Sequence, residues 1–142
     1  MSLVSEIVER LKAGQTVFQT VAGAIEFSML EKNMLAAPGA YVMSAEEASG
    51  ENERATGKVL QRLESDIAVV IVVENLSGTL GAPAGDELED LKKFVRSRLI
   101  GFEPASAEEP VTHVSGALIK ASGGTVWFED VYSAPSLLEQ SS

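Results

Sequence analysis

Residues 59–75, VLQRLESDIAVVIVVEN, carry the most informative pattern in the chain. Their odd positions are apolar almost throughout, whereas their even positions are polar at Arg62, Glu64 and Asp66 and apolar from Ala68 to Val72. Because successive side chains of a strand point to opposite faces of a sheet, this pattern predicts one long strand. The strand is half-exposed at its beginning and buried on both faces near its end. Its first half is therefore expected to project from the body of the protein, beside a strand over Ala40–Ser44.

Three helices are predicted around this strand. Apolar residues of Leu3–Leu11 fall on one helical face, Ser2 can cap the start of this helix, and Gly14 can end it. A second helix is predicted over Ala24–Met34. The third helix, Asp86–Ile100, has an apolar stripe, with acidic residues in its first turn and basic residues in its second half. This charge distribution matches the helix dipole.

The remaining apolar segments are predicted strands. Thr16–Val21 is a short strand. Val111–Lys120 and Thr125–Ser133 are predicted to form a hairpin around a Gly-Gly turn, with Lys120 opposite Thr125.

Polar segments are predicted to connect these elements. Ser44–Gly57 has no apolar periodicity and is interpreted as a loop or as the tip of a hairpin arm. Ser77–Gly85 and Glu103–Pro110 are predicted loops, and Ala134–Ser142 is a predicted flexible C-terminal tail. Because no internal repeat or domain boundary is visible, residues 1–133 are expected to form a single domain.

The composition narrows the function classes. Aspartate and glutamate outnumber lysine and arginine by 21 to 11, so the formal net charge is −10 and phosphate backbones would repel the chain. The absence of cysteine excludes disulfides, thiolate catalysis and cysteine-based zinc sites. Met1–Lys12 lacks the pattern of a signal peptide, and the longest apolar run, Ile67–Val73, is too short to span a bilayer. We therefore expect a protein that is made and folded in a cytoplasm.

The stretch TVWFEDVYS, residues 125–133, gathers aromatic and acidic side chains and is the first candidate for a catalytic site. Strand alternation places Glu129 and Asp130 on opposite faces, so the two carboxylates cannot flank one substrate. In the predicted hairpin, His113 lies opposite Tyr132 and diagonal to Asp130 on the same face. A histidine–carboxylate contact of this kind is more often structural than catalytic, and no sequence signature places a nucleophile nearby.

Two polar segments have the composition of ligand-binding loops. Residues 77–81, SGTLG, lie between a strand and a helix but lack the lysine of a P-loop and the glycine pattern of a dinucleotide-binding loop. Asp86 and Glu87 at the start of the next helix would also repel a phosphate. The acidic stretch Glu46–Glu53 lacks the spacing of an EF-hand. The sequence therefore predicts no catalytic residue, no cofactor and no metal site.

The order of short motifs along the chain resembles one protein family. The motifs are P-G-A-Y-V at 38–42, a polar loop with Asn52, Arg54, Ala55, Thr56 and Gly57, the pair Gln61-Arg62, a helix from Leu88 to Leu99 followed by Gly101, G-F-E-P at 101–104, G-A-L at 116–118, and an aromatic final strand. In this order and spacing, over residues 3–133, the chain resembles the tail terminator (tail completion) proteins of Mu-like and related tailed bacteriophages and prophages.

This resemblance implies both a fold and a role. The implied fold is α/β (α+β), a mixed and mainly antiparallel sheet flanked by two to three helices, with an extended β-hairpin arm. The implied role is structural and not enzymatic: a hexameric ring caps the head-proximal end of the tail tube, and of the sheath if the tail is contractile. Its implied partners are other copies of the chain, the tail tube protein, the sheath protein and the head connector, which docks on the ring. DNA passes through the lumen, no membrane is involved, and the ring belongs to the virion tail or neck after assembly in the host bacterial cytoplasm.

The projecting strand and the polar loop are expected to contact neighbouring subunits or the tail, because an arm outside the body can pack against a neighbour in a ring. The candidate residues of this interface are Glu46, Glu47, Asn52, Arg54, Thr56, Gln61, Arg62, Glu64, Glu129 and Asp130. The acidic charge would also keep passing DNA from adhering to the lumen. Two alternatives stay open: another neck or head–tail joining component, and a small-molecule-binding or enzymatic α/β domain that uses His113.

Overall fold

The computed structural model describes residues 2–29, 38–74 and 82–141. Along the chain these residues form α1 (Leu3–Lys12), β1 (Thr20–Ala22), α2 (Ala24–Ser28), β2 (Gly39–Asn52), β3 (Leu60–Glu74), α3 (Ala82–Leu99), β4 (Thr112–Ser122) and β5 (Thr125–Glu139). The strands form one sheet in the order β1-β2-β3-β5-β4. β1 is parallel to β2, and the other pairs are antiparallel. The predicted fold class, a mixed and mainly antiparallel sheet with flanking helices, is confirmed.

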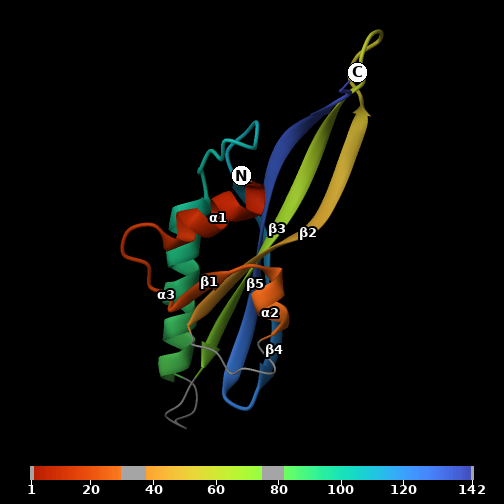
Figure 1. Ribbon diagram of the computed structural model, residues 1–142. Coiled ribbons are helices and arrows are strands. Elements are labelled where there is room, and N and C mark those ends of the chain that lie inside the picture. The colour runs from red at the N-terminus through yellow and green to blue at the C-terminus, as the bar shows by residue number, and fades with distance from the viewer. Residues whose placement is uncertain (1, 30–37, 75–81, 142) are drawn as a thin grey trace.

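β3 is the central strand and has the predicted burial pattern. Its odd-numbered residues from Ile67 to Val73 belong to the larger hydrophobic core, together with residues of α1 and α3. Its even-numbered residues Val70 and Val72 belong to a smaller core on the other face, against which Phe27 of α2 packs. Figure 1 shows α1 and α3 together beside one face of the sheet and α2 beside the other. Burial on both faces explains why the second half of β3 is apolar at every position.

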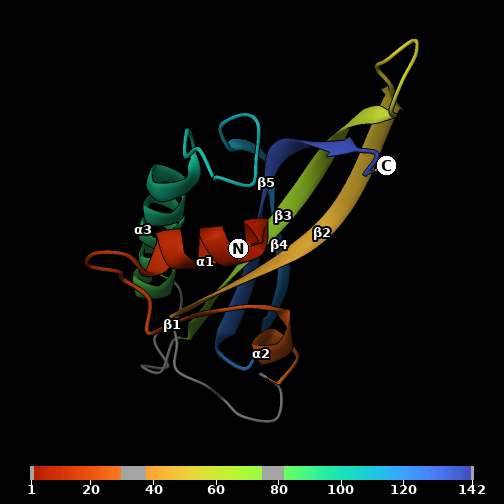
Figure 2. The same ribbon diagram turned by 45° about the horizontal axis from the view of Figure 1, so that its top comes forward.

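Three strands extend past the helices and form an arm (Figures 1 and 2). We define the arm as residues 44–66 and 134–140, which comprise most of β2, the first half of β3, the connection between them and the end of β5. β3 pairs with β2 on one side and, along its whole length, with β5 on the other. The predicted extended hairpin arm is therefore present, and β5 adds a third strand to it.

Two predicted boundaries in the arm differ from the structure. Of the two interpretations of Ser44–Gly57, the hairpin arm is confirmed and the loop is wrong for most of the segment, because β2 continues to Asn52. β5 continues to Glu139, so residues 134–139 are strand where a flexible tail was predicted. Neither segment alternates between apolar and polar residues, because most of the arm lies outside both hydrophobic cores. Pairing with β3 holds both segments in the sheet.

The helix predictions are confirmed in the body, with shifts at the ends. Ser2 caps α1 through a reciprocal pair of hydrogen bonds with Ser5, as in a capping box. α3 begins at Ala82, four residues before the predicted start, whereas β1 is shorter than predicted. The predicted helix beyond α2 falls partly in residues 30–37, and the predicted loop before α3 falls mainly in residues 75–81. Both segments lie outside the described residues.

β4 and β5 form the predicted hairpin, but the register at the turn is different. Ser122, and not Lys120, pairs with Thr125. Two β-bulges in β4 then shift the register by one residue each, so His113 still lies opposite Tyr132 as predicted.

Candidate functional site

Asp130 in β5 is fully buried and is bonded at both carboxylate oxygens. Its Oδ1 accepts a hydrogen bond from Arg96 Nη2 at 3.0 Å and lies 2.7 Å from His113 Nε2. Its Oδ2 accepts hydrogen bonds from Arg96 Nε at 3.1 Å and from the Tyr132 hydroxyl at 2.6 Å. We call these four residues the Asp130 cluster. It joins α3, β4 and β5 at one point.

Hydrogen bonding keeps the Asp130 carboxylate ionised despite its burial. Burial acts to raise the pKa of Asp130, but the bonds from Arg96, Tyr132 and His113 outweigh it and lower the pKa. The bond to Asp130 raises the pKa of Arg96. Burial, followed by the bond to Asp130, raises the pKa of Tyr132. The cluster is therefore a hydrogen-bonded ion pair with its carboxylate inside the protein, an arrangement that is costly to disturb.

The spacing of residues in α3 and β5 explains how Arg96 reaches Asp130. Residues four apart in a helix and two apart in a strand are each separated by about 6 Å along their element. Lys92 lies four residues before Arg96, and its Nζ is 4.3 Å from the ring centroid of Phe128. Phe128 lies two residues before Asp130 on the same face of β5. Two successive turns of α3 therefore contact alternate residues of β5.

Gly116 provides the space that the cluster needs. It pairs with Asp130 across the hairpin. A Cβ atom at this position would lie 3.0 Å from Asp130 Oδ1 and 3.0 Å from Phe128 Cζ, a tighter approach than about nine in ten Cβ contacts in proteins. A larger residue would therefore displace either the carboxylate or the ring.

The sequence predicted part of this cluster. The proximity of His113 and Asp130 is confirmed. Glu129 pairs with Val70, a residue of the smaller core, so it faces away from Asp130 as strand alternation predicted. Arg96 was missed, because its charge was attributed to the helix dipole. Its position directly after Val95, at the border of the apolar stripe, is the signal that could have identified a side chain directed at the sheet.

The geometry of the cluster is that of a structural tie. Both oxygens of Asp130 are occupied by side chains of the same chain, and none of its four residues lines either of the two pockets described below. Asp130 was also a predicted interface residue. Its complete burial corrects that prediction, because its side chain has no surface to offer a partner subunit.

The tip of the arm is held by predicted interface residues. Asn52 Oδ1 accepts hydrogen bonds from the backbone N–H groups of Arg54 at 3.2 Å and Leu60 at 3.0 Å. Arg54 donates to the carbonyl of Lys58 at 3.2 Å and to the carboxylate of Glu139 at the end of β5. These contacts link the connection between β2 and β3 to all three strands of the arm.

Further predicted residues hold the strands of the arm together and tie the arm to the body. Gln61 Nε2 donates to the carbonyl of Gly50 at 2.9 Å, which joins β3 to β2. Arg62 bonds to Glu64 at 2.7 Å and also to Glu109 in the connection before β4. Bonding to Glu109 and Glu64 raises the pKa of Arg62. The arm is thus tied to the body by charge as well as by strand pairing.

The structure divides the ten predicted interface residues into two groups. Eight lie in the arm, where Glu46, Glu47 and Thr56 are exposed, and the other five make the intramolecular contacts described above. Glu129 and Asp130 lie in the body. The arm is therefore the surface that brings the predicted residues together.

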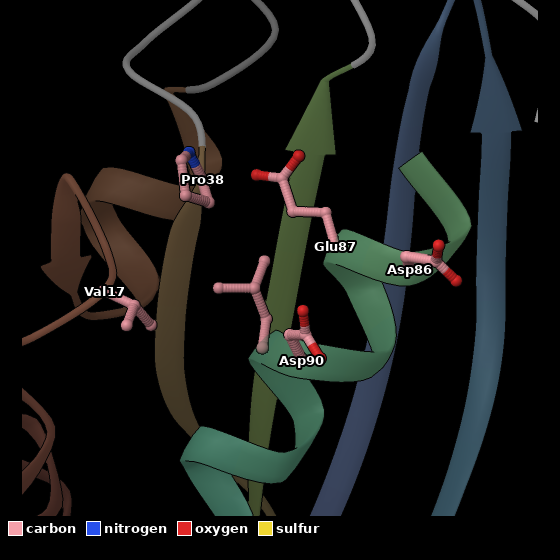
Figure 3. Close-up of a pocket in the computed structure, with 6 residues that line it drawn as sticks. Val17, Pro38, Asp86, Glu87 and Asp90 are labelled. Atoms are coloured by element: carbon pink, nitrogen blue, oxygen red, sulfur yellow. The ribbon is translucent and has the colours of Figure 1, made fainter. Parts of the chain in front are cut away.

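Two pockets lie away from the Asp130 cluster. One, of about 410 Å³, is formed between α3 and the segments that carry Val17 and Pro38 (Figure 3). Leu91 adds to its apolar lining, and its carboxylates are Asp86, Glu87 and Asp90. Because α3 begins at Ala82, Asp86 and Glu87 lie after its first turn, whereas the sequence predicted them within it. Their negative charge still disfavours a phosphate in this pocket. The other pocket, of about 330 Å³, is lined by residues of the connection 103–110.

Within the described ranges, no group of three or more histidine, aspartate and glutamate side chains is arranged to hold a metal ion. None of the helices in the described part of the chain has the length and hydropathy needed to cross a membrane.

Comparisons with known proteins agree with the order of motifs noted in the sequence. A family model described as "Phage tail terminator protein" matches residues 2–140. A search of curated proteins gives no match. Among solved structures, the chain is similar to a chain of the "Virion of native gene transfer agent (GTA) particle", with 14% sequence identity and a TM-score of 0.52. The likeness covers 95% of this chain and 98% of that chain, and at this identity it supports the fold alone.

Proposed function

Because this chain belongs to the phage tail terminator family, we propose that it ends tail polymerisation as a hexameric ring on the head-proximal end of the tail tube. The family is one of structural phage proteins, so the chain is a structural phage tail or neck protein. In this proposal the ring also caps the sheath if the tail is contractile, and it offers the surface on which the head connector docks.

The three-stranded arm is the observation that carries the proposal. It extends past the helices (Figure 2), and Ala134 at its base is the only residue of the described arm that belongs to either buried core. An element that projects in this way supports contacts outside the subunit, because it adds surface without adding to the core. Its internal hydrogen bonds keep it in shape before a partner binds.

The exposure of the arm residues indicates which of them can contact a partner directly. We propose that Glu46, Glu47 and Thr56 contact a neighbouring subunit or the tail tube directly, since all three are exposed on the arm. Asn52, Arg54, Gln61, Arg62 and Glu64 then hold the arm in the geometry that the contact needs. Glu129, which is partly exposed on the face of the smaller core, is retained as a candidate contact.

The charge of the chain is consistent with a DNA conduit. With a formal net charge of −10 on each subunit, a ring of six copies presents strong negative charge. A negative lumen repels the DNA backbone and lets DNA pass without adhering.

The decisive experiment measures the length of tail tubes. Tubes are assembled from the tail tube protein of the same phage or prophage, with and without this chain, and are imaged by electron microscopy. We expect tubes of undefined length without the chain. With it, we expect arrested growth and a ring at one end, while light scattering reports whether the free protein is already a hexamer.

The alternative functions give different results in the same assay. Tubes that keep their normal length without the chain, but fail to join heads, would identify a head–tail joining component. A chain that never binds tubes and instead binds a metabolite in a His113-dependent way would identify a small-molecule-binding domain. Either result would overturn the terminator proposal.

A further inference from the structure

Exposed apolar side chains of the described residues are concentrated in two places. Ten large hydrophobic side chains are exposed there, and six of them belong to β4 or to the arm. The first group, which we call the edge patch, lies on β4 and consists of Val114, Leu118 and Ile119, each of which is 48% to 58% exposed. The second group, which we call the arm patch, lies at the far end of the arm and consists of Val59, Leu137 and Leu138, each of which is 37% to 46% exposed. Grouped exposed apolar residues mark interaction surfaces, whereas single ones need no explanation.

β4 is an edge strand whose protection is incomplete. It pairs with β5 on one side, and every one of its residues is exposed. Natural edge strands commonly carry bulges, charges or proline, which prevent unwanted pairing. β4 has two bulges, but its pairing skips Val114 and Ile119, so apolar β-branched residues occupy them. The bulges therefore hinder a continued hydrogen-bonded sheet while they present apolar side chains.

The arm patch sits on a frame that is already ordered. The backbone of Val59 pairs with Gln140, and the tip contacts of Arg54 and Asn52 lie beside it. Leu137 and Leu138 are successive residues of β5, so they lie on opposite faces of the arm, and a partner packed on one face contacts one of the two. Little further ordering would be needed for this patch to bind a partner.

The two patches have complementary charge surroundings. Strand β4 contains Lys120 and His113 and no carboxylate, which is unusual in a chain with twice as many acidic as basic residues. The arm, residues 44–66 and 134–140, contains seven Asp and Glu and three Lys and Arg, a net charge of −4. Two copies that meet through these surfaces would bury apolar area while an acidic element faces a strand without acidic residues.

We propose that the arm patch of one copy packs against the edge patch of the next copy. This inference rests on the proposed ring and names the contact that builds it. The arm and β4 extend toward opposite ends of the molecule (Figure 1). A contact between two different surfaces is heterologous, and repeated contacts of this kind close into a ring when the rotation permits. Side-chain packing across the bulged edge, and not a continuous sheet, holds the two copies together.

Engineered cysteines test this contact, because the native chain has no cysteine. Leu118→Cys is mixed with Leu137→Cys, and in parallel with Leu138→Cys, in the presence of tail tubes under mild oxidation. We expect a mixed disulfide dimer with at least one of the two arm variants. We expect it to form roughly tenfold faster than in a control mixture, since a preformed contact holds thiols at millimolar effective concentration. The control replaces Leu118→Cys by Ile25→Cys, a residue of α2 that is 75% exposed.

The outcomes separate this contact from the function itself. Each single-cysteine variant alone should give no disulfide above the control, because the contact is heterologous; crosslinking of one variant with itself would indicate a symmetric contact and overturn the proposal. Rings on tubes without a mixed disulfide from either arm residue would also overturn it, while leaving the terminator function intact. Tubes whose growth the wild-type chain does not arrest would overturn the function, and the ring contact with it.

A second variant tests the same contact without disulfide crosslinking. Leu118→Glu places a carboxylate in the edge patch at a side chain that is 58% exposed, so the subunit should fold with an unchanged circular dichroism spectrum. We expect loss of rings on tubes. The matched change Ile25→Glu should leave rings intact, and rings that form equally well with both variants would contradict the proposed packing.

Discussion

Replacement of Asp130 by asparagine is the perturbation that most directly probes how α3 is held to the hairpin. The amide has the same shape as the carboxylate but no charge. It keeps one acceptor oxygen for Arg96 or for Tyr132, whereas the native carboxylate serves four hydrogen bonds at its two oxygens. Asp130→Asn therefore removes the anionic partner of Arg96 without opening a cavity.

The expected loss of stability follows from burial. Removing one partner of a buried ion pair typically costs about 3–5 kcal/mol. Here Arg96 is 36% exposed, so water rehydrates part of the charge that is left behind. We therefore expect a loss of about 2–3 kcal/mol in the free energy of unfolding. For a chain of this size, that corresponds to a fall in Tm of about 4–12 °C.

The assay is thermal and urea unfolding followed by circular dichroism. Glu129→Gln is the matched control, since it neutralises the adjacent carboxylate in the same strand and points to the other face. Because Glu129 takes part in no ion pair among the described residues, its neutralisation should change stability by no more than about 0.5 kcal/mol.

Equal stability of Asp130→Asn and Glu129→Gln would refute the structural role given to the Asp130 carboxylate. The same holds if Asp130→Asn is as stable as wild type while Arg96→Met is strongly destabilised, because the arginine would then act through packing of its side chain and not through its charge. A double-mutant cycle of these two substitutions measures the coupling directly, and we expect a coupling of at least about 1 kcal/mol.

Further predictions concern pH, the hairpin and the arm. The pKa of Asp130 is lower in the folded protein than its ordinary value of 3.8, so the carboxylate contributes fully to the free energy of unfolding above pH 3.8 and loses this contribution as the pH falls through the lowered pKa. The difference in stability between wild type and Asp130→Asn, followed by unfolding at a series of pH values, should therefore shrink in this acidic range and stay constant above it. Gly116→Ala should cost about 1–3 kcal/mol in urea unfolding because its Cβ would crowd the Asp130 carboxylate, whereas Gly50→Ala, whose Cβ would meet only ordinary contacts, should change stability by no more than about 0.5 kcal/mol. Arg54→Ala should lower global stability by less than about 1 kcal/mol, since its bond to Glu139 is a surface pair, yet it should speed amide hydrogen exchange at the tip of the arm; unchanged exchange there would refute the role given to Arg54.

The hairpin of β4 and β5 illustrates where sequence patterns succeed and where they stop. Counting back from the turn placed His113 opposite Tyr132, and the structure has this pair. The count was correct only because two deviations cancelled: the turn is tighter by two residues than predicted, and two bulges in β4 each add one residue. Bulges depend on the packing of a strand against its neighbour, so no periodicity within β4 could reveal them.

The arm illustrates the opposite case. The alternation of residues 59–66 indicated a projecting strand, but one of its neighbours was interpreted as a loop or the tip of an arm, and the other as a tail. A strand with solvent on both faces has no hydrophobic pattern to display, and its only marker is the partner with which it pairs. Residues 134–139 therefore became recognisable as strand only beside β3.

Local patterns were sufficient to predict α1, α3 and the buried half of β3, because the periodicity of apolar residues in a helix or strand shows which side chains are buried. They were also sufficient to separate Glu129 from Asp130, since the strand pleat alone places the two carboxylates on opposite faces. Contacts between distant segments set the rest. Arg96 meets Asp130 across 34 positions of the chain, and Glu139 at the end of β5 pairs with Leu60 across 79 positions. Such pairings depend on how the packed elements fit together in space, and the pattern of residues within one segment carries no information about that fit.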